Sequence, residues 1–166
     1  VGIHPTDAEE LFDVNALTSL AHHDKVVAIG ECGLDYFHVK DEAKKAIQKQ
    51  VFIEHIKISH AVNKPLMIHC RDAMRDLIDI LNTHKELIRK DSVMHFFSGT
   101  EEEARELLAL GFSFTFGGVI TFVRDYDDVV RSIPLDKILS ETDAPYVTPI
   151  PHRGTRNEPS YVVEVE

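Results

Sequence analysis

V-V-A-I-G-E-C-G-L-D-Y, residues Val26–Tyr36, is the stretch that decides the fold class. Its first five residues are apolar or small, which is typical of a strand buried on both faces, as in a parallel sheet. We expect this strand to end at Glu31, with Gly33 two positions later. A carboxylate at the end of a buried strand needs a cation or strong hydrogen-bond donors. For Glu31 alone, backbone N–H groups of a turn are the favoured donors.

The same pattern, a buried strand followed by a polar side chain, recurs along the chain. Short apolar runs precede His69, His95 and Asp143, and the first residues read as the end of a strand that leads to His4. Helical periodicity separates these runs, most clearly from about residue 41 to residue 61. Such alternation of strands and helices with short loops predicts a parallel α/β sheet.

The predicted fold class is therefore α/β, a (β/α)8 TIM-like barrel that is incomplete in this sequence and has about five full strands. We expect one domain over residues 1–166. A barrel places its active site at the carboxyl ends of successive strands, where the polar residues lie. An open doubly wound sheet, which gathers ligands at one crevice, is the alternative. The opening strand is followed by no G-x-G-x-x-G motif, and the chain has no phosphate-binding glycine–lysine loop, which disfavours nucleotide-cofactor folds.

Composition limits the classes of function. The 166 residues are 43% hydrophobic, enough for one sizeable core, and the formal net charge is -10. This charge argues against broad electrostatic attraction to nucleic acid, but bound metal ions can supply positive charge for a phosphate. The two cysteines lie far apart in no metal-ligand spacing, which indicates free thiols in a reducing cytoplasm. We expect no membrane association, since no run is long enough to span a membrane and no signal peptide is present.

Five residues at strand ends carry the chemistry: His4, Glu31, His69, His95 and Asp143. A barrel would direct all five into one mouth. Imidazole and carboxylate ligands suit zinc, manganese or magnesium. Two such ions about 3.5–4 Å apart can activate a water and stabilise an in-line displacement at phosphorus. A single histidine is more often a core or loop group, so the hypothesis depends on the strand ends taken together.

Several motifs in this order resemble those of the TatD family of metal-dependent deoxyribonucleases. They are V-V-A-I-G-E-C-G-L-D-Y, P-L-M-I-H-C-R-D-A, H-F-F-S-G-T and S-E-T-D-A-P-Y, and G-I-H-P and R-N-E-P match two further family signatures. The resemblance covers essentially the whole chain. It implies a divergent (β/α)8 barrel of the amidohydrolase-like metal hydrolases, with two divalent metal ions (Zn, Mg or Mn) as cofactors.

The resemblance also implies a role for each site residue. Glu31 would bridge the two ions, with His69 and His95 on one ion. Asp143 would hold the other ion and orient or deprotonate the attacking water, so Glu31 and Asp143 are the expected catalytic residues. The candidate substrate contacts are His4, Arg71, Arg153 and Arg156. For each arginine, a role at a helix start or on the surface is an equally open interpretation.

The leading hypothesis is a monomeric, cytoplasmic hydrolase that cleaves phosphodiester bonds in DNA from short or single-stranded ends. The alternative is a metal-dependent deacylase or amidohydrolase, such as a D-aminoacyl-tRNA deacylase, because a metal-bound hydroxide can also attack a carbonyl. A third hypothesis is a barrel-derived interaction protein without enzymatic activity. Family members begin with a strand that carries a His-x-His pair. We expect that strand, its neighbours and part of the last helix to be missing from this sequence.

Overall fold

The computed structural model describes residues 1–166, and its five strands form one sheet in the order β1-β2-β3-β4-β5. The strands are β1 (Ile29–Asp35), β2 (Leu66–Arg71), β3 (Val93–Met94), β4 (Ser113–Phe116) and β5 (Ile138–Ser140). Every strand pairs in parallel with the next. The strand order never reverses, so the sheet lacks the switch point at which a doubly wound fold binds its ligand. The expected topology of an incomplete α/β barrel is therefore confirmed.

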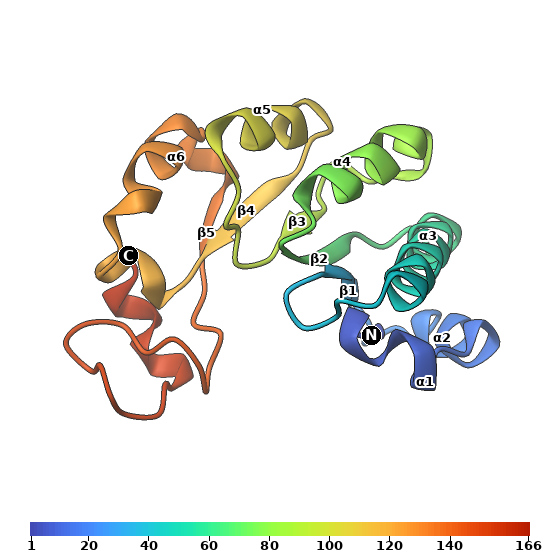
Figure 1. Cartoon of the computed structure of the whole chain (residues 1–166), viewed down its shortest axis with the longest axis horizontal. Coiled ribbons are helices and arrows are strands. Elements are labelled where there is room, and N and C mark those ends of the chain that lie inside the picture. Colours follow the sequence, from blue (N-terminus) through green and yellow to red (C-terminus); the bar gives the residue numbers. More distant parts are fainter.

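The helices cover one side of this sheet. They are α1 (Ala8–Leu11), α2 (Val14–Ala21), α3 (Glu42–Val62), α4 (Met74–Thr83), α5 (Glu101–Ala109) and α6 (Asp127–Ser132), and a 3₁₀ helix covers Pro159–Glu164. Figure 1 shows α3, α4, α5 and α6 following one another along the convex side of the strands, with the opposite side open. Helices α3, α4, α5 and α6 are the crossovers that successive parallel strand pairs require. None of the helices has the length and apolar character that crossing a membrane would require.

Strand β2 shows how the sheet separates core from site. Its side chains alternate, with Leu66, Ile68 and Cys70 buried in the hydrophobic core and Met67 and His69 more exposed. Because neighbours on a strand face opposite sides, the polar residues lie on the open face of the sheet. The two cysteines are free, as predicted from their spacing, and both are buried.

The expectation that the first long strand ends at Glu31 is wrong. Strand β1 begins only at Ile29 and continues through Asp35, while Val27, which was assigned to the strand, precedes it and is 80% exposed. Only the last two residues of the apolar run, Ile29 and Gly30, belong to the strand, which continues past Glu31.

A β-bulge directs Glu31 to the open face. The register with β2 shifts between Ile29 and Cys32, both of which are buried in the core. The two residues between them therefore share one side of the sheet, an arrangement that re-aims a side chain. Gly33 follows with a φ of +134°, and a Cβ at this position would lie 2.0 Å from the carbonyl oxygen of His69. Only glycine permits this close approach of β1 to the histidine strand.

Candidate metal centre

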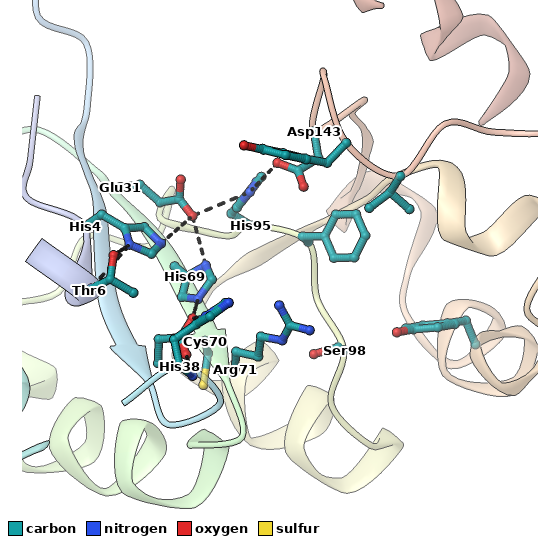
Figure 2. A pocket seen from close by; sticks show the side chains of 15 residues that line it. His4, Thr6, Glu31, His38, His69, Cys70, Arg71, His95, Ser98 and Asp143 are labelled. Carbon is teal, nitrogen blue, oxygen red and sulfur yellow. Dashed lines mark hydrogen bonds and ion pairs between the residues drawn. The ribbon is translucent and has the colours of Figure 1, made fainter. Parts of the chain in front are cut away.

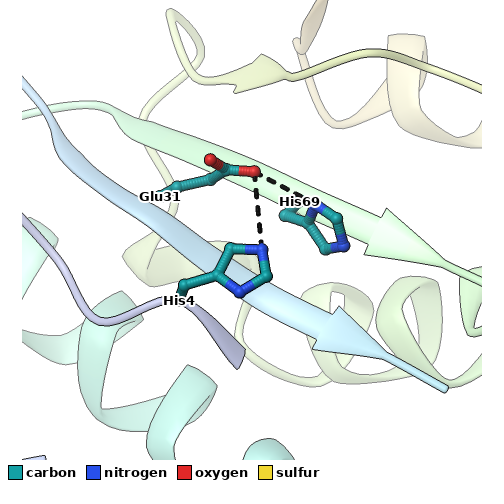
Figure 3. Close-up of side chains that lie close together, drawn as sticks. All are labelled: His4, Glu31 and His69. Atoms are coloured by element: carbon teal, nitrogen blue, oxygen red, sulfur yellow. Dashed lines mark hydrogen bonds and ion pairs between the residues drawn. The ribbon is translucent and has the colours of Figure 1, made fainter. Parts of the chain in front are cut away.

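The carboxylate of Glu31 lies among three imidazole rings (Figure 2), and Figure 3 shows it beside two of them, those of His4 and His69. Its Oε1 atom is 3.0 Å from Nδ1 of His69, 3.6 Å from Nε2 of His95 and 3.8 Å from Nε2 of His4. The four side chains come from β1, the end of β2, the residue after β3 and the segment before α1. Residues far apart in sequence thus converge on one oxygen atom.

The donor atoms near Glu31 form one compact group, which fits a divalent metal ion, and a looser second group that also includes Glu31. The donors of His4, Glu31 and His69 all lie within 4.8 Å of one another. In the second group, Nε2 of His95 is 3.6 Å from Oδ1 of Asp143 as well as from Glu31. Two donors bound to one tetrahedral ion at about 2.1 Å lie about 3.4 Å apart, so these separations match those of ligands. Nitrogen and carboxylate donors of this kind suit zinc or manganese.

The structure places the predicted ligands around one cavity of about 1050 Å³. The cavity is lined by His4, Glu31, His69, His95 and Asp143. The resemblance assigned His4 to the substrate, whereas the geometry places its Nε2 atom within the first donor group.

The three candidate arginines lie in different places. Arg71 lines the cavity, and its guanidinium lies 3.8 Å from the centre of the Phe37 ring. Arg153 lies outside the lining residues, where it donates a hydrogen bond of 2.8 Å to the carbonyl of Thr148. Arg156 is exposed and is also outside the lining. The cavity thus brings Arg71 alone of the three beside the donor groups.

Asp35, which sequence reasoning missed, holds His69 from the other side of the ring. Its Oδ2 atom lies 3.0 Å from Nε2 of His69, and its side chain is fully buried. Gln48 of α3 binds the backbone of Asp35 twice, accepting from its N–H at 2.9 Å and donating to its carbonyl at 3.2 Å. Helix α3 therefore fixes the carboxylate that orients the imidazole, which leaves Nδ1 directed at Glu31.

Glu141, which was also missed, holds His95 in the same manner. Its Oε2 atom lies 2.5 Å from Nδ1 of His95, and its Oε1 atom is buried without a hydrogen-bond partner. The backbone N–H of His95 donates to the carbonyl of Ile68 at 2.8 Å. Both the ring and the backbone of His95 are thus positioned, and Nε2 is left to face Glu31 and Asp143.

Asn157, in the R-N-E-P motif, holds the loop that carries Asp143. Its side chain is 2% exposed, and its Nδ2 atom donates to the carbonyls of Thr142 and Tyr146, each at 2.6 Å. The backbone N–H of Asn157 donates to the carbonyl of Pro145 at 3.1 Å. Three carbonyl groups that flank Asp143 are therefore tied to one buried residue.

The charge of the Glu31 carboxylate favours the binding of cations at this site. Burial would raise the pKa of the Glu31 carboxyl, but the hydrogen bond with His69 and the neighbouring imidazoles hold this pKa below its usual range. Burial lowers the pKa of His4. Burial also opposes protonation of His95, but its contacts with Asp143 and Glu141 raise its pKa to about 10. At neutral pH Glu31 is thus ionised and His4 is neutral, while His95 carries a proton that a divalent ion would replace.

One sequence signal could have found the missed carboxylates. Alternate residues of a strand face the same side, so Asp35 continues the row of Glu31 and Gly33 along β1. Glu141 likewise precedes Asp143 by two positions. For Asn157 the sequence offers only its place in the R-N-E-P motif. Its partners, Thr142 and Tyr146, lie in a loop, where no strand periodicity relates them to Asn157.

The strands of this barrel carry imidazole and carboxylate donors at their carboxyl ends. This arrangement is typical of α/β-barrel metal hydrolases. The family model described as TatD related DNase matches residues 1–166, and the chain belongs to this family. The resemblance of its motifs to TatD proteins is thereby confirmed.

Relatives and a solved structure agree with this assignment. The chain is 42% identical over 166 residues to the uncharacterized metal-dependent hydrolase YcfH of Escherichia coli (strain K12), with 99% of the chain and 62% of YcfH covered. It is 37% identical over 174 residues to the 3'-5' ssDNA/RNA exonuclease TatD of Cronobacter turicensis, with 99% and 65% covered. The crystal structure of YjjV, a TatD homolog from Escherichia coli K12, superposes with a TM-score of 0.90 at 31% identity, covering 99% of this chain and 64% of YjjV. The chain thus spans less than two thirds of the length of these proteins.

Proposed function

We propose that this protein is a metal-dependent phosphodiesterase that cleaves single-stranded DNA from its ends. The observation that carries the proposal is the position of Glu31 Oε1 between three imidazole nitrogens, at 3.0–3.8 Å from each. The family and the relative named as a 3'-5' ssDNA/RNA exonuclease support this choice of substrate.

The roles of the residues follow from their chemistry. Bound divalent ions, two in our proposal, would acidify a water molecule and neutralise phosphate charge. Glu31, His69, His95 and Asp143 would hold these ions, with His4 beside them. Asp143 would also accept a proton from the attacking water, since its carboxylate is one-third exposed and lines the cavity.

Arg71 would bind a phosphate oxygen on the cavity wall, where a guanidinium can form two parallel hydrogen bonds. Arg153 and Arg156 remain candidates for more distant phosphates of the strand. We propose that the protein is a monomer and that it lies in the cytoplasm. Its two free thiols support the cytoplasmic assignment alone.

The test replaces Glu31 by glutamine, which keeps the size of the side chain and removes its charge. We expect Glu31→Gln to lower the rate of release of nucleotides from a single-stranded oligonucleotide by more than about 100-fold, because loss of an outer partner of a ligand already costs about 10- to 100-fold. Glu86→Gln, at an exposed glutamate after α4, is the matched control and should keep the wild-type rate. Removal of metal by a chelator should abolish activity, and added Mn²⁺ or Zn²⁺ should restore it.

An unchanged rate in Glu31→Gln would overturn the proposal. The same preparations should be assayed in parallel on a D-aminoacyl-tRNA. Cleavage of the aminoacyl ester with no release of nucleotides from DNA would favour the deacylase, because the same donor set can activate water against a carbonyl.

A further inference from the structure

Tyr146 lies exposed at the rim of the cavity, where its ring adds little to the hydrophobic core. Of the four tyrosines in the chain it is the one with a mostly exposed side chain, at 69%. The hydroxyl of Tyr36 donates a hydrogen bond, the ring of Tyr161 stacks on His152, and Tyr126 is half-buried. Burial of an aromatic ring is the usual source of its contribution to stability, and Tyr146 contributes little in this way.

The backbone of Tyr146 is nevertheless held firmly. Its N–H donates to the carbonyl of Asp143 at 2.9 Å, and its own carbonyl accepts from Asn157 Nδ2 at 2.6 Å. Pro145, directly before it, accepts from the N–H of Asn157. Because the backbone is held and a tyrosine side chain has only two rotatable χ angles, covering the ring with a ligand costs little conformational entropy.

The ring borders the same cavity as the metal donors. Tyr146 lines it together with Glu31, His69, His95 and Asp143. At about 1050 Å³ the cavity slightly exceeds the range of about 300–1000 Å³ that is usual for small-molecule sites. A phosphate at the donors would fill only a part of this volume, which leaves room for an attached nucleoside beside the ring.

We propose that Tyr146 is the stacking surface for the base of an unpaired nucleotide whose phosphate lies at the donors of Glu31 and Asp143. The inference rests on the proposed function, and it identifies the contact that would select single strands. In a duplex each base already stacks on its neighbours, so its face is closed to a side chain. A base in a single strand can leave the stack and cover the ring.

Stacking also suits the charge of this protein better than further ionic contacts. The formal net charge is -10, and four carboxylates lie at or beside the cavity: Glu31, Asp35, Glu141 and Asp143. A basic groove that follows the phosphate backbone is absent from the cavity wall, where Arg71 is the one arginine or lysine among the lining residues. Contact between a base and an aromatic ring needs no charge and tolerates any base.

The experiment measures stacking independently of cleavage. The probe is a six-residue single-stranded oligonucleotide with phosphorothioate linkages and 2-aminopurine at one position in turn, mixed with the protein and Mn²⁺. The fluorescence of 2-aminopurine is quenched when the base stacks. We expect quenching at one position near an end, and Tyr146→Ala should remove it and weaken binding five-fold or more, since base–aromatic stacking contributes about 1–3 kcal/mol per base.

Matched variants separate the ring from its other properties. Tyr146→Phe, which keeps the ring, should recover the affinity lost in Tyr146→Ala, whereas Tyr146→Leu should not. Leu135→Ala removes another exposed apolar side chain, 86% exposed and outside the cavity, and should leave quenching and affinity unchanged. An oligonucleotide with an abasic residue at the quenched position should bind wild type and Tyr146→Ala equally.

Each outcome decides one of the two proposals. Quenching that persists in Tyr146→Ala, or that occurs at no position, overturns the stacking surface even if the wild type cleaves unmodified DNA. Quenching that depends on Tyr146 without cleavage of unmodified DNA supports the stacking surface and overturns the phosphodiesterase.

Discussion

Replacement of Asn157 by alanine tests whether one buried amide positions Asp143. The side chain donates two hydrogen bonds of 2.6 Å, to the carbonyls of Thr142 and Tyr146. A hydrogen bond of this kind contributes about 0.5–1.5 kcal/mol net, so Asn157→Ala should lower the free energy of unfolding by about 1–3 kcal/mol. Asn157→Asp keeps the shape but sets an acceptor against two carbonyl oxygens, and it should lower this free energy further.

The second expected effect concerns metal binding. Loss of a residue that orients a metal ligand weakens metal affinity by about 10- to 100-fold. Because a ligand stabilises the folded state in proportion to RT ln(1 + [L]/Kd), a tenfold weaker Kd removes about 1.4 kcal/mol of the stabilisation at saturating metal. We therefore expect the rise in melting temperature on addition of Mn²⁺ to be smaller in Asn157→Ala than in the wild type.

The assay is thermal and urea unfolding over a series of Mn²⁺ concentrations. Asn82→Ala, at an exposed asparagine of α4, is the control and should shift the free energy of unfolding by no more than about 0.5 kcal/mol. If Asn157→Ala loses stability but gains as much from Mn²⁺ as the wild type, the loop does not position Asp143. If it loses no stability, the hydrogen bonds of Asn157 do not hold the loop.

Two further predictions concern the scaffold. Burial lowers the pKa of His55, whose Nε2 atom accepts a hydrogen bond of 3.0 Å from the N–H of Ile3. Below about pH 6.5 the unfolded chain therefore binds a proton at this histidine that the folded chain does not bind. The free energy of unfolding should therefore fall as the pH is lowered through 6.5, and less steeply in His55→Gln; an equal slope in His55→Gln and in the exposed control His60→Gln would contradict this. Thr100 and Glu103 form a capping box at the start of α5, so Thr100→Ala should lower the free energy of unfolding in urea by about 0.5–2 kcal/mol. Ser19→Ala, at an exposed serine, is the control. Equal free energies of unfolding for the two variants would reject a role of the cap in stability.

Much of the fold could be predicted because local and global signals agree. The helix expected from about residue 41 to residue 61 is α3, Glu42–Val62. Asp41 caps its start, and Asn63, with a φ of +54°, ends it. The strand around Glu31 was misplaced for a physical reason. An apolar run indicates burial, but Val27 lies where no other element covers it. The bulge at Glu31 depends on pairing with β2, and pairing is not encoded in β1 alone.

The sequence yields the candidate donors of the site, whereas their partners emerge only from the structure. Histidines and carboxylates after buried runs can be recognised one strand at a time, which led to Glu31, His69, His95 and Asp143. The partners of these donors depend on register. Asp35 faces His69 because Gly33 pairs with His69 and Asp35 with Arg71, a relation between two strands.

The arrangement of these partners bears on the order in which the proposed ligands would bind. Asp35 and Glu141 each bind the ring nitrogen that faces away from the donor group, so the cavity holds both rings in place before any ligand arrives. The same carboxylates, with Glu31 and Asp143, give the cavity an excess of negative charge that a single protonated His95 offsets only in part. Bound cations would offset this negative charge for an approaching phosphate, because like charges repel strongly where water is scarce. In the proposed function, metal would therefore bind first and nucleic acid second.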